Sequence, residues 1–200
     1  MSVAFVVTEH SGALPPERLA QYEQVRGRLE QVAGMRVATV QYEAVESLDG
    51  ADAVVLSGSY DPWAAHSPDA IERLGEAVRG YDGPVLGICA GMQLQARFAG
   101  GTTRHSPGGL ETGFAAIEIV EPGGLLEGLP PRIEVYQHHG DEIEELPGDF
   151  RVLARSSACA IEAIAHRERR WWGTQFHPEE FDDRHPAGER ILRNFFELAR

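Results

Sequence analysis

The chain has 200 residues, of which 31 are acidic and 18 are basic, and its formal net charge is −13. Every one of the 18 basic residues is arginine. The sequence therefore excludes a lysine Schiff base, lysine-anchored pyridoxal phosphate, and the lysines of phosphate loops and kinases. The acidic balance argues against nucleic acids and membrane surfaces as partners, because both are anionic.

The length predicts a single domain over residues 1–200, long enough to bury a substantial core. No secretion signal is recognisable, and no segment approaches the ~20 apolar residues of a membrane span. Two cysteines, Cys89 and Cys159, are too few for a disulfide framework. We therefore expect a cytoplasmic protein with reduced thiols.

The first half of the chain alternates predicted strands and helices. Continuous apolar runs, typical of buried parallel strands, occur at residues 3–8, 36–41, 51–56 and 84–88. Apolar residues at steps of three and four predict helices over residues 15–33, 67–80 and 91–98. This alternation is typical of a parallel sheet connected by helices.

The second half is richer in predicted strands. They fall at residues 114–120, 133–137, 151–154, 160–165 and 171–176, and a final helix is predicted over 186–199. The whole pattern predicts an α/β fold: a mostly parallel sheet flanked by helices, with an added β-rich segment.

The segment Gly87-Ile88-Cys89-Ala90-Gly91 lies between a predicted strand and a predicted helix. It is the G-x-C-x-G form of a nucleophile elbow, in which flanking glycines allow a tight, strained turn. The cysteine would project beside a helix N-terminus, where the helix dipole favours the thiolate. Cys89 is therefore the candidate nucleophile, although most free cysteines are small buried hydrophobic residues.

A cysteine nucleophile needs a base and a group that orients the base. His177 follows the apolar segment 171–176, so it is expected at a strand end, and Glu179 lies two residues further on. A carboxylate there could accept from one ring nitrogen and leave the other facing Cys89. The other seven histidines have no comparable context, and we interpret Cys89, His177 and Glu179 as a catalytic triad.

Acyl chemistry also needs backbone N–H groups directed at the developing oxyanion. The segment Leu56-Ser57-Gly58-Ser59 follows a predicted buried strand, and Gly58 permits a close approach of backbone to substrate. The N–H of Ala90, directly after the nucleophile, would be the second donor. Gly58 and Ala90 are therefore predicted to form the oxyanion hole.

Two motifs together resemble class I (triad) glutamine amidotransferases, which have a flavodoxin-like fold. They are Gly87-Ile88-Cys89-Ala90-Gly91-Met92-Gln93 and Gln175-Phe176-His177-Pro178-Glu179. Thr112-Gly113-Phe114-Ala115 and His139-Gly140-Asp141 further resemble the glutaminase part of GMP synthases. The loop after the third strand reads Ser57-Gly58-Ser59-Tyr60 where the family usually has Ser-Gly-Gly-Pro.

The resemblance implies that Gln93 helps to hold a bound glutamine, with the backbone of His138, His139 and Gly140 near its α-amino acid end. It implies no cofactor and no metal ion. A metal site built from His138, His139 and Asp141, or from His177 and His185, is disfavoured because neither set has a recognised ligand spacing.

The resemblance implies that Cys89 attacks the side-chain amide of glutamine and that the released ammonia reaches a separate synthetase subunit. Two alternatives stay open. One is a stand-alone hydrolase of γ-glutamyl compounds that uses the same triad. The other is a non-catalytic relative that binds and regulates a partner.

Overall fold

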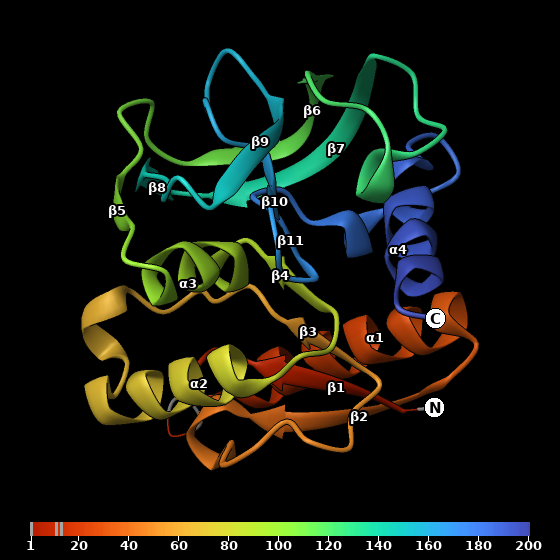
Figure 1. Cartoon of the computed structure of the whole chain (residues 1–200). Coiled ribbons are helices and arrows are strands. Elements are labelled where there is room, and N and C mark those ends of the chain that lie inside the picture. The colour runs from red at the N-terminus through yellow and green to blue at the C-terminus, as the bar shows by residue number, and fades with distance from the viewer. Residues whose placement is uncertain (1, 11, 13) are drawn as a thin grey trace.

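A β-sheet with helices on both faces forms the centre of the molecule (Figure 1). The computed structural model describes residues 2–10, 12 and 14–200. The α-helices of the described residues are α1 Pro16–Ala33, α2 Pro68–Gly80, α3 Ala90–Phe98 and α4 Ala187–Leu198. The strands are β1 Ser2–Val7, β2 Arg36–Gln41, β3 Ala53–Leu56, β4 Val85–Ile88, β5 Thr102–His105, β6 Glu111–Ile119, β7 Arg132–His139, β8 Asp141–Glu145, β9 Phe150–Arg155, β10 Ala163–His166 and β11 Trp171–Thr174.

Within the described residues, nine strands form one sheet in the order β2-β1-β3-β4-β11-β10-β9-β6-β7. Neighbours from β2 to β11 are parallel. Neighbours from β11 to β7 are antiparallel. The predicted α/β class is confirmed, and the predicted β-rich segment extends the parallel half of the same sheet, so that the sheet as a whole is mixed.

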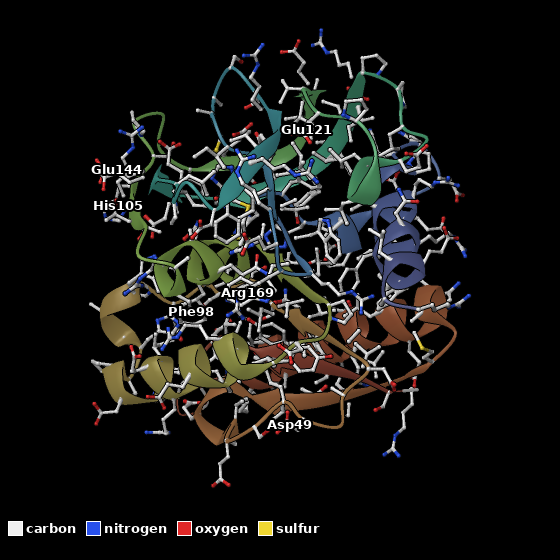
Figure 2. All side chains as sticks on the ribbon, in the orientation of Figure 1. Asp49, Phe98, His105, Glu121, Glu144 and Arg169 are labelled. Carbon is white, nitrogen blue, oxygen red and sulfur yellow. The ribbon has the colours of Figure 1, made fainter. Side chains whose placement is uncertain are left out.

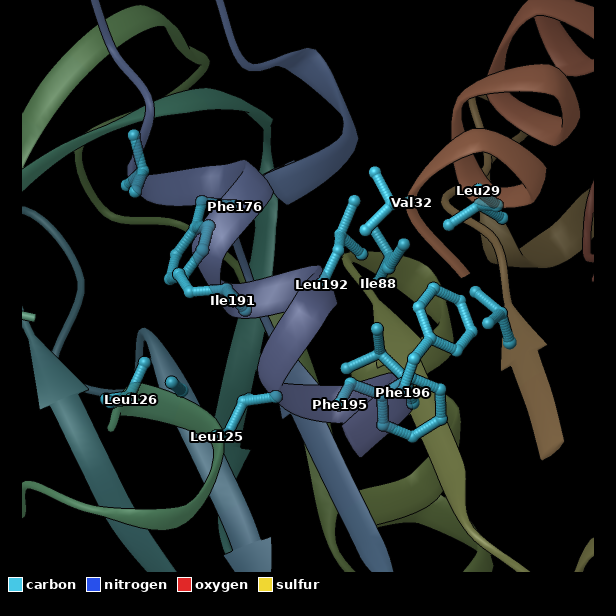
Figure 3. Packing of buried hydrophobic residues seen from close by; sticks show 14 of the residues in the cluster. Leu29, Val32, Ile88, Leu125, Leu126, Phe176, Ile191, Leu192, Phe195 and Phe196 are labelled. Atoms are coloured by element: carbon cyan, nitrogen blue, oxygen red, sulfur yellow. The ribbon is translucent and has the colours of Figure 1, made fainter. Parts of the chain in front are cut away.

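The parallel half of the sheet separates two hydrophobic cores. Phe5 of β1 points to the core made by α1 and α4, and the next residue, Val6, points to the core made by α2 and α3. Figure 3 shows the first core, where side chains of α1 and α4 pack against strand residues such as Ile88. Because both faces are covered, every residue of β3 and β4 is buried. This explains their continuous apolar sequences.

Two strands of the structure, β5 and β8, were not predicted. They pair antiparallel in a separate small sheet. β5 reads Thr-Thr-Arg-His and β8 reads Asp-Glu-Ile-Glu-Glu, so neither shows the apolar alternation that indicates a strand. Arg104 bridges them by donating to Glu142 Oε1 at 2.7 Å, and Figure 2 shows the exposed His105 of β5 at the edge of the molecule.

The surface is strongly charged, as the side chains of Asp49, Glu144 and Arg169 illustrate (Figure 2). Within residues 2–10, 12 and 14–200, no helix has both the length and the apolar character that crossing a bilayer requires.

Helix α3 begins two residues after the end of β4, and its first turn lies directly against the end of β3. A Cβ atom added at Gly91 would lie 2.5 Å from the carbonyl oxygen of Leu56. One added at Gly87 would lie 2.5 Å from the carbonyl carbon of Gly91. Such distances are far inside van der Waals contact, so the strand–helix turn depends on glycine at both positions.

We predict that Gly91→Ala lowers the free energy of unfolding by about 1–3 kcal/mol, because the added methyl group overpacks a rigid backbone contact. Gly27→Ala is the matched control, since Gly27 is exposed on α1 and its added Cβ meets no atom within 4 Å. It should raise the free energy of unfolding by about 0.5–1 kcal/mol. Urea unfolding of both variants measures the difference. Shifts of the same sign would contradict this explanation of the turn.

Candidate active site

Three neighbouring parallel strands end at the same edge of the sheet, and the segments after them form the candidate site. β3 ends at Leu56, β4 at Ile88 and β11 at Thr174, with Ile88 directly opposite Thr174 in the register. The carboxyl ends of parallel strands are where α/β proteins usually place functional residues. The segments after these strands carry three predicted site residues: Gly58, Cys89 and His177.

Cys89 has the strained backbone that the sequence motif predicts. Its φ is 50° and its ψ is −107°, and no other non-glycine residue in the described part of the chain has a positive φ. Such a conformation costs about 1–3 kcal/mol and persists only when neighbouring groups hold it. Here the Cys89 N–H donates to the Thr174 carbonyl at 2.7 Å, and the Cys89 carbonyl accepts from the Gln93 N–H at 3.1 Å.

His177 and Glu179 form a buried pair beside Cys89. The distance between His177 Nδ1 and Glu179 Oε1 is 2.8 Å, and the two side chains are 13% and 6% exposed. The His177 N–H donates to the carbonyl of Tyr136 on β7 at 2.8 Å. Arg28 of α1 donates to the backbone carbonyl of Glu179. These contacts fix the backbone on both sides of the pair.

The electrostatic surroundings of His177 favour its protonated form. Burial by itself lowers the pKa of His177. The charge of Glu179, the interaction with Cys89 and the hydrogen bond to Glu179 outweigh burial, and together they raise this pKa well above its ordinary value. The imidazolium is therefore the prevailing form of His177 at neutral pH, which suits a group that must donate a proton.

Gly58 adjoins both His177 and Cys89. A Cβ atom added at Gly58 would lie 2.8 Å from His177 Cε1 and 3.5 Å from Cys89 Cβ. The structure thus brings together Cys89, His177 and Glu179 with the predicted oxyanion loop. Their catalytic roles remain a prediction.

A pair of glutamine side chains lies behind the thiol. Gln175 Nε2 donates to Cys89 Sγ at 3.6 Å, and Gln175 Oε1 accepts from Gln93 Nε2 at 3.1 Å. Gln93 Nε2 also donates to the carbonyl of Asp141 at 2.9 Å. Both N–H groups of the Gln93 amide are thereby used, so Gln93 can meet a ligand only through its carbonyl oxygen. The contact of Gln175 with sulfur was not predicted, although Gln175 belongs to the motif around His177.

A cavity of about 280 Å³ opens beside the thiol. Its lining includes Cys89 and the predicted substrate-binding residues Gln93, His138, His139 and Gly140. The His139 side chain points away from solvent, with Nε2 3.5 Å from Glu111 Oε2. Burial lowers the pKa of His139, so the contact of this residue with a ligand is expected through its backbone. In the described residues, no cluster of three or more histidine, cysteine and acidic side chains could hold a metal ion.

The predicted oxyanion donors differ in where they lie. Ala90 borders the same cavity as Cys89, and the described part of the chain supplies no acceptor for its N–H. Gly58 borders a second cavity of about 320 Å³, on the side of His177 and Glu179. Ser59, the residue after Gly58, borders the Cys89 cavity. The N–H of Ser59 is therefore a donor candidate that the sequence pattern did not single out.

The two cavities meet at an aromatic pair. Tyr60 and His138 border both cavities, and their ring centroids are 5.2 Å apart. The guanidinium of Arg18 lies over the Tyr60 ring, 3.3 Å from its centroid, which holds the ring by a cation–π contact. Neither Tyr60 nor Arg18 belongs to a recognisable catalytic motif, so sequence analysis alone did not place them near the site.

Cys159 provides a contrast to Cys89. It is almost fully buried, and burial together with the charge of Glu162 raises the pKa of its thiol to about 12. A thiol in such a place is unreactive.

We predict that Glu179→Gln lowers the pKa of His177, because the substitution removes the charge that opposes burial. NMR titration of the imidazole measures this directly. In the wild type, the stability that protonated His177 contributes is complete below the pKa of an unfolded histidine, near 6.5, and is lost as the pH rises through the raised folded-state pKa. In Glu179→Gln this loss should begin at lower pH. An unchanged titration curve would show that Glu179 does not set the protonation of His177.

Comparison with known proteins places this geometry in a family. The model of the family described as glutamine amidotransferase class-I matches residues 20–199. A Pyrococcus abyssi protein, named as the glutamine-hydrolyzing subunit of GMP synthase, is 44% identical over 128 residues, which cover 64% of this chain and 66% of that protein, just under two thirds of its length. The Methanococcoides burtonii protein of the same name is 41% identical over 153 residues, which cover 74% of each chain.

Solved structures agree with the family match. A Thermoplasma acidophilum protein, described as a candidate subunit of GMP synthase, superposes with a TM-score of 0.82 at 29% identity, covering 98% of this chain and 94% of that chain. A glutamine amidotransferase from Thermotoga maritima shares the fold, with a TM-score of 0.75 at 19% identity over 99% of this chain and 98% of that chain. With the family model matched over nearly the whole chain, this protein belongs to the class-I glutamine amidotransferase family.

Proposed function

We propose that this chain hydrolyses the side-chain amide of glutamine and supplies the ammonia to the separate synthetase subunit of a GMP synthase. Cys89 is the nucleophile, His177 the acid and base, and Glu179 the group that orients His177. The observation that carries the proposal is the strained Cys89 turn beside the buried His177–Glu179 pair, in a chain that belongs to the class-I amidotransferases.

The reaction follows from the positions of these groups. The Cys89 thiolate attacks the carboxamide carbon of glutamine, and the carbonyl oxygen becomes an oxyanion held by backbone N–H groups at Ala90 and in the Gly58 loop. As the C–N bond breaks, His177 gives its proton to the nitrogen, which leaves as ammonia. A water molecule, deprotonated by His177, then attacks the γ-glutamyl thioester. The C–S bond breaks, glutamate leaves and the thiolate is restored.

The Cys89 cavity is the proposed glutamine site. In this arrangement the carbonyl oxygen of the Gln93 side chain faces the ligand, and the backbone at His138, His139 and Gly140 contacts its α-amino acid end. Supporting this, all four residues border the same cavity as Cys89.

The proposal of a separate acceptor subunit draws support from the names of the relatives, which describe the glutamine-hydrolyzing subunit of GMP synthase. Activation of an acceptor by a nucleotide commonly uses a phosphate-binding lysine, and this chain contains none. We further propose a cytoplasmic location, because a cysteine nucleophile requires the reduced thiol that this compartment maintains.

Replacing the nucleophile tests the proposal. Cys89→Ala should reduce ammonia release from glutamine by about 10⁴-fold or more, because no other group can form the thioester. Cys159→Ala is the matched control, since this second cysteine is buried and unreactive, and it should retain activity within about twofold. Both variants are compared with the wild type in a coupled ammonia assay. Undiminished release from Cys89→Ala would overturn the mechanism.

The proposed partner is tested by measuring the same activity with and without it. We expect ammonia release to rise by about 5- to 150-fold when the synthetase subunit co-purified from the native source is added, because its binding should be coupled to the glutamine site. Glutamine should also be a better substrate than γ-glutamyl peptides. Equal rates with and without the subunit, together with faster cleavage of γ-glutamyl peptides, would favour a stand-alone hydrolase.

A further inference from the structure

The carbonyl group of Gly58 is surrounded by hydroxyl groups. Ser57 Oγ donates to it at 2.6 Å, and Thr8 Oγ1 and Tyr22 Oη lie 3.1 Å from it. Ser57 Oγ is itself oriented by the N–H of Thr8, at 2.9 Å. A backbone carbonyl has two lone pairs, so three hydroxyls within reach leave this oxygen fully satisfied in its present direction.

Tyr22 is a fixed part of this cluster. It lies on α1 with 8% of its surface exposed, and its hydroxyl donates to Glu9 Oε2 at 2.7 Å. The single phenolic hydrogen is shared between Glu9 and Gly58. Glu9 is also buried, and its Oε1 lies 3.5 Å from Arg18 Nε. Burial and the contact with Glu9 raise the pKa of Tyr22, so the phenol keeps its proton at every working pH.

The direction of the Gly58 carbonyl fixes the direction of the next N–H. No peptide bond between described residues is cis, and in a trans peptide the C=O and the N–H point in opposite directions. The Gly58 carbonyl points to Tyr22, and these two residues border the second cavity. The N–H of Ser59 belongs to the same peptide and therefore points the opposite way. Ser59 borders the cavity of Cys89 and Ala90.

Without this hold the peptide could rotate. Gly58 has no Cβ, so both orientations of the Gly58–Ser59 peptide are sterically accessible. The rotated peptide would present a carbonyl oxygen, instead of an N–H group, to the Cys89 cavity. A carbonyl dipole in that direction would destabilise a developing oxyanion.

We propose that Tyr22, together with Ser57, is a positioning residue that keeps the Gly58–Ser59 peptide turned so that the Ser59 N–H serves as an oxyanion donor. This inference rests on the proposed function, because it assigns a task within acyl transfer at Cys89. Tyr22 does not touch the substrate and acts through the backbone of the loop.

The test compares two reactions of Cys89 in the isolated chain. With p-nitrophenyl acetate, the thiolate attacks the ester carbon, passes through an oxyanion and expels p-nitrophenolate, forming an acetyl thioester. With iodoacetamide, the thiolate displaces iodide and no oxyanion forms. Both rates are measured for the wild type, Tyr22→Phe and Ser57→Ala. Tyr81→Phe is the matched control, because the Tyr81 hydroxyl also donates to a backbone carbonyl, that of Ala51, at 2.9 Å and away from the site.

We expect acylation to fall by about 10- to 100-fold in Tyr22→Phe and in Ser57→Ala, which is less than the effect of deleting a donor outright. The rate with iodoacetamide should change less than about twofold in both, since its transition state has no oxyanion. Tyr81→Phe should leave both rates at the wild-type level. With glutamine as substrate, kcat should fall in Tyr22→Phe while KM stays nearly constant, because the lost interaction exists only in the transition state.

An unchanged ratio of the two rates in Tyr22→Phe and Ser57→Ala would overturn the inference, as would an equal fall of both rates or an equal effect of Tyr81→Phe. A wild-type chain that the ester does not acylate above the level of Cys89→Ala would also overturn it. Ammonia release from glutamine separates the two proposals. If the wild type releases none while the ratio falls in the variants, the proposed function fails and the role of Tyr22 stands.

Discussion

The candidate site depends on one close contact, that between the first turn of α3 and the loop after β3. The Gly91 N–H donates to the Ser57 carbonyl at 3.0 Å, and the absence of a side chain at Gly91 allows the two backbones to meet. This contact places the thiol of Cys89 and the peptides of the Gly58 loop in one rigid body. Because backbone groups make the contact, the relative position of nucleophile and oxyanion loop is insensitive to side-chain motion.

Both halves of the sheet contribute to the site. The parallel half supplies Cys89 and the Gly58 loop, while the antiparallel half supplies the carbonyl of Tyr136, which holds the backbone of His177. The antiparallel strand β7 also carries His138, which borders both cavities. Strand β11, which lies between the two halves, leads directly into the segment of His177. The arrangement explains why the β-rich part of the chain continues the central sheet instead of forming a separate layer.

The parts of the molecule that the sequence predicts well are those with apolar periodicity or a tight motif. The buried strands β3 and β4 and the helix that Ser67 caps fall close to their predicted positions, as does the turn at Cys89. Strands β5 and β8 were missed because ion pairs, rather than apolar burial, join them. The hydroxyl cluster around Gly58 was missed for another reason: Thr8 and Tyr22 lie far from Gly58 in sequence, and only the packing of α1 on β1 brings them together. No local pattern records such a contact.

The backbone of Cys89 also bears on how this chain can change over generations. A residue with φ of 50° and ψ of −107° sits where glycine is at ease and every other residue is strained. Glycine at this position would relieve about 1–3 kcal/mol of strain, a large share of the stability of a typical domain. Drift toward a sturdier fold therefore favours loss of the cysteine. Its presence in this sequence is a record of purifying selection for chemistry against the pull of thermodynamic stability.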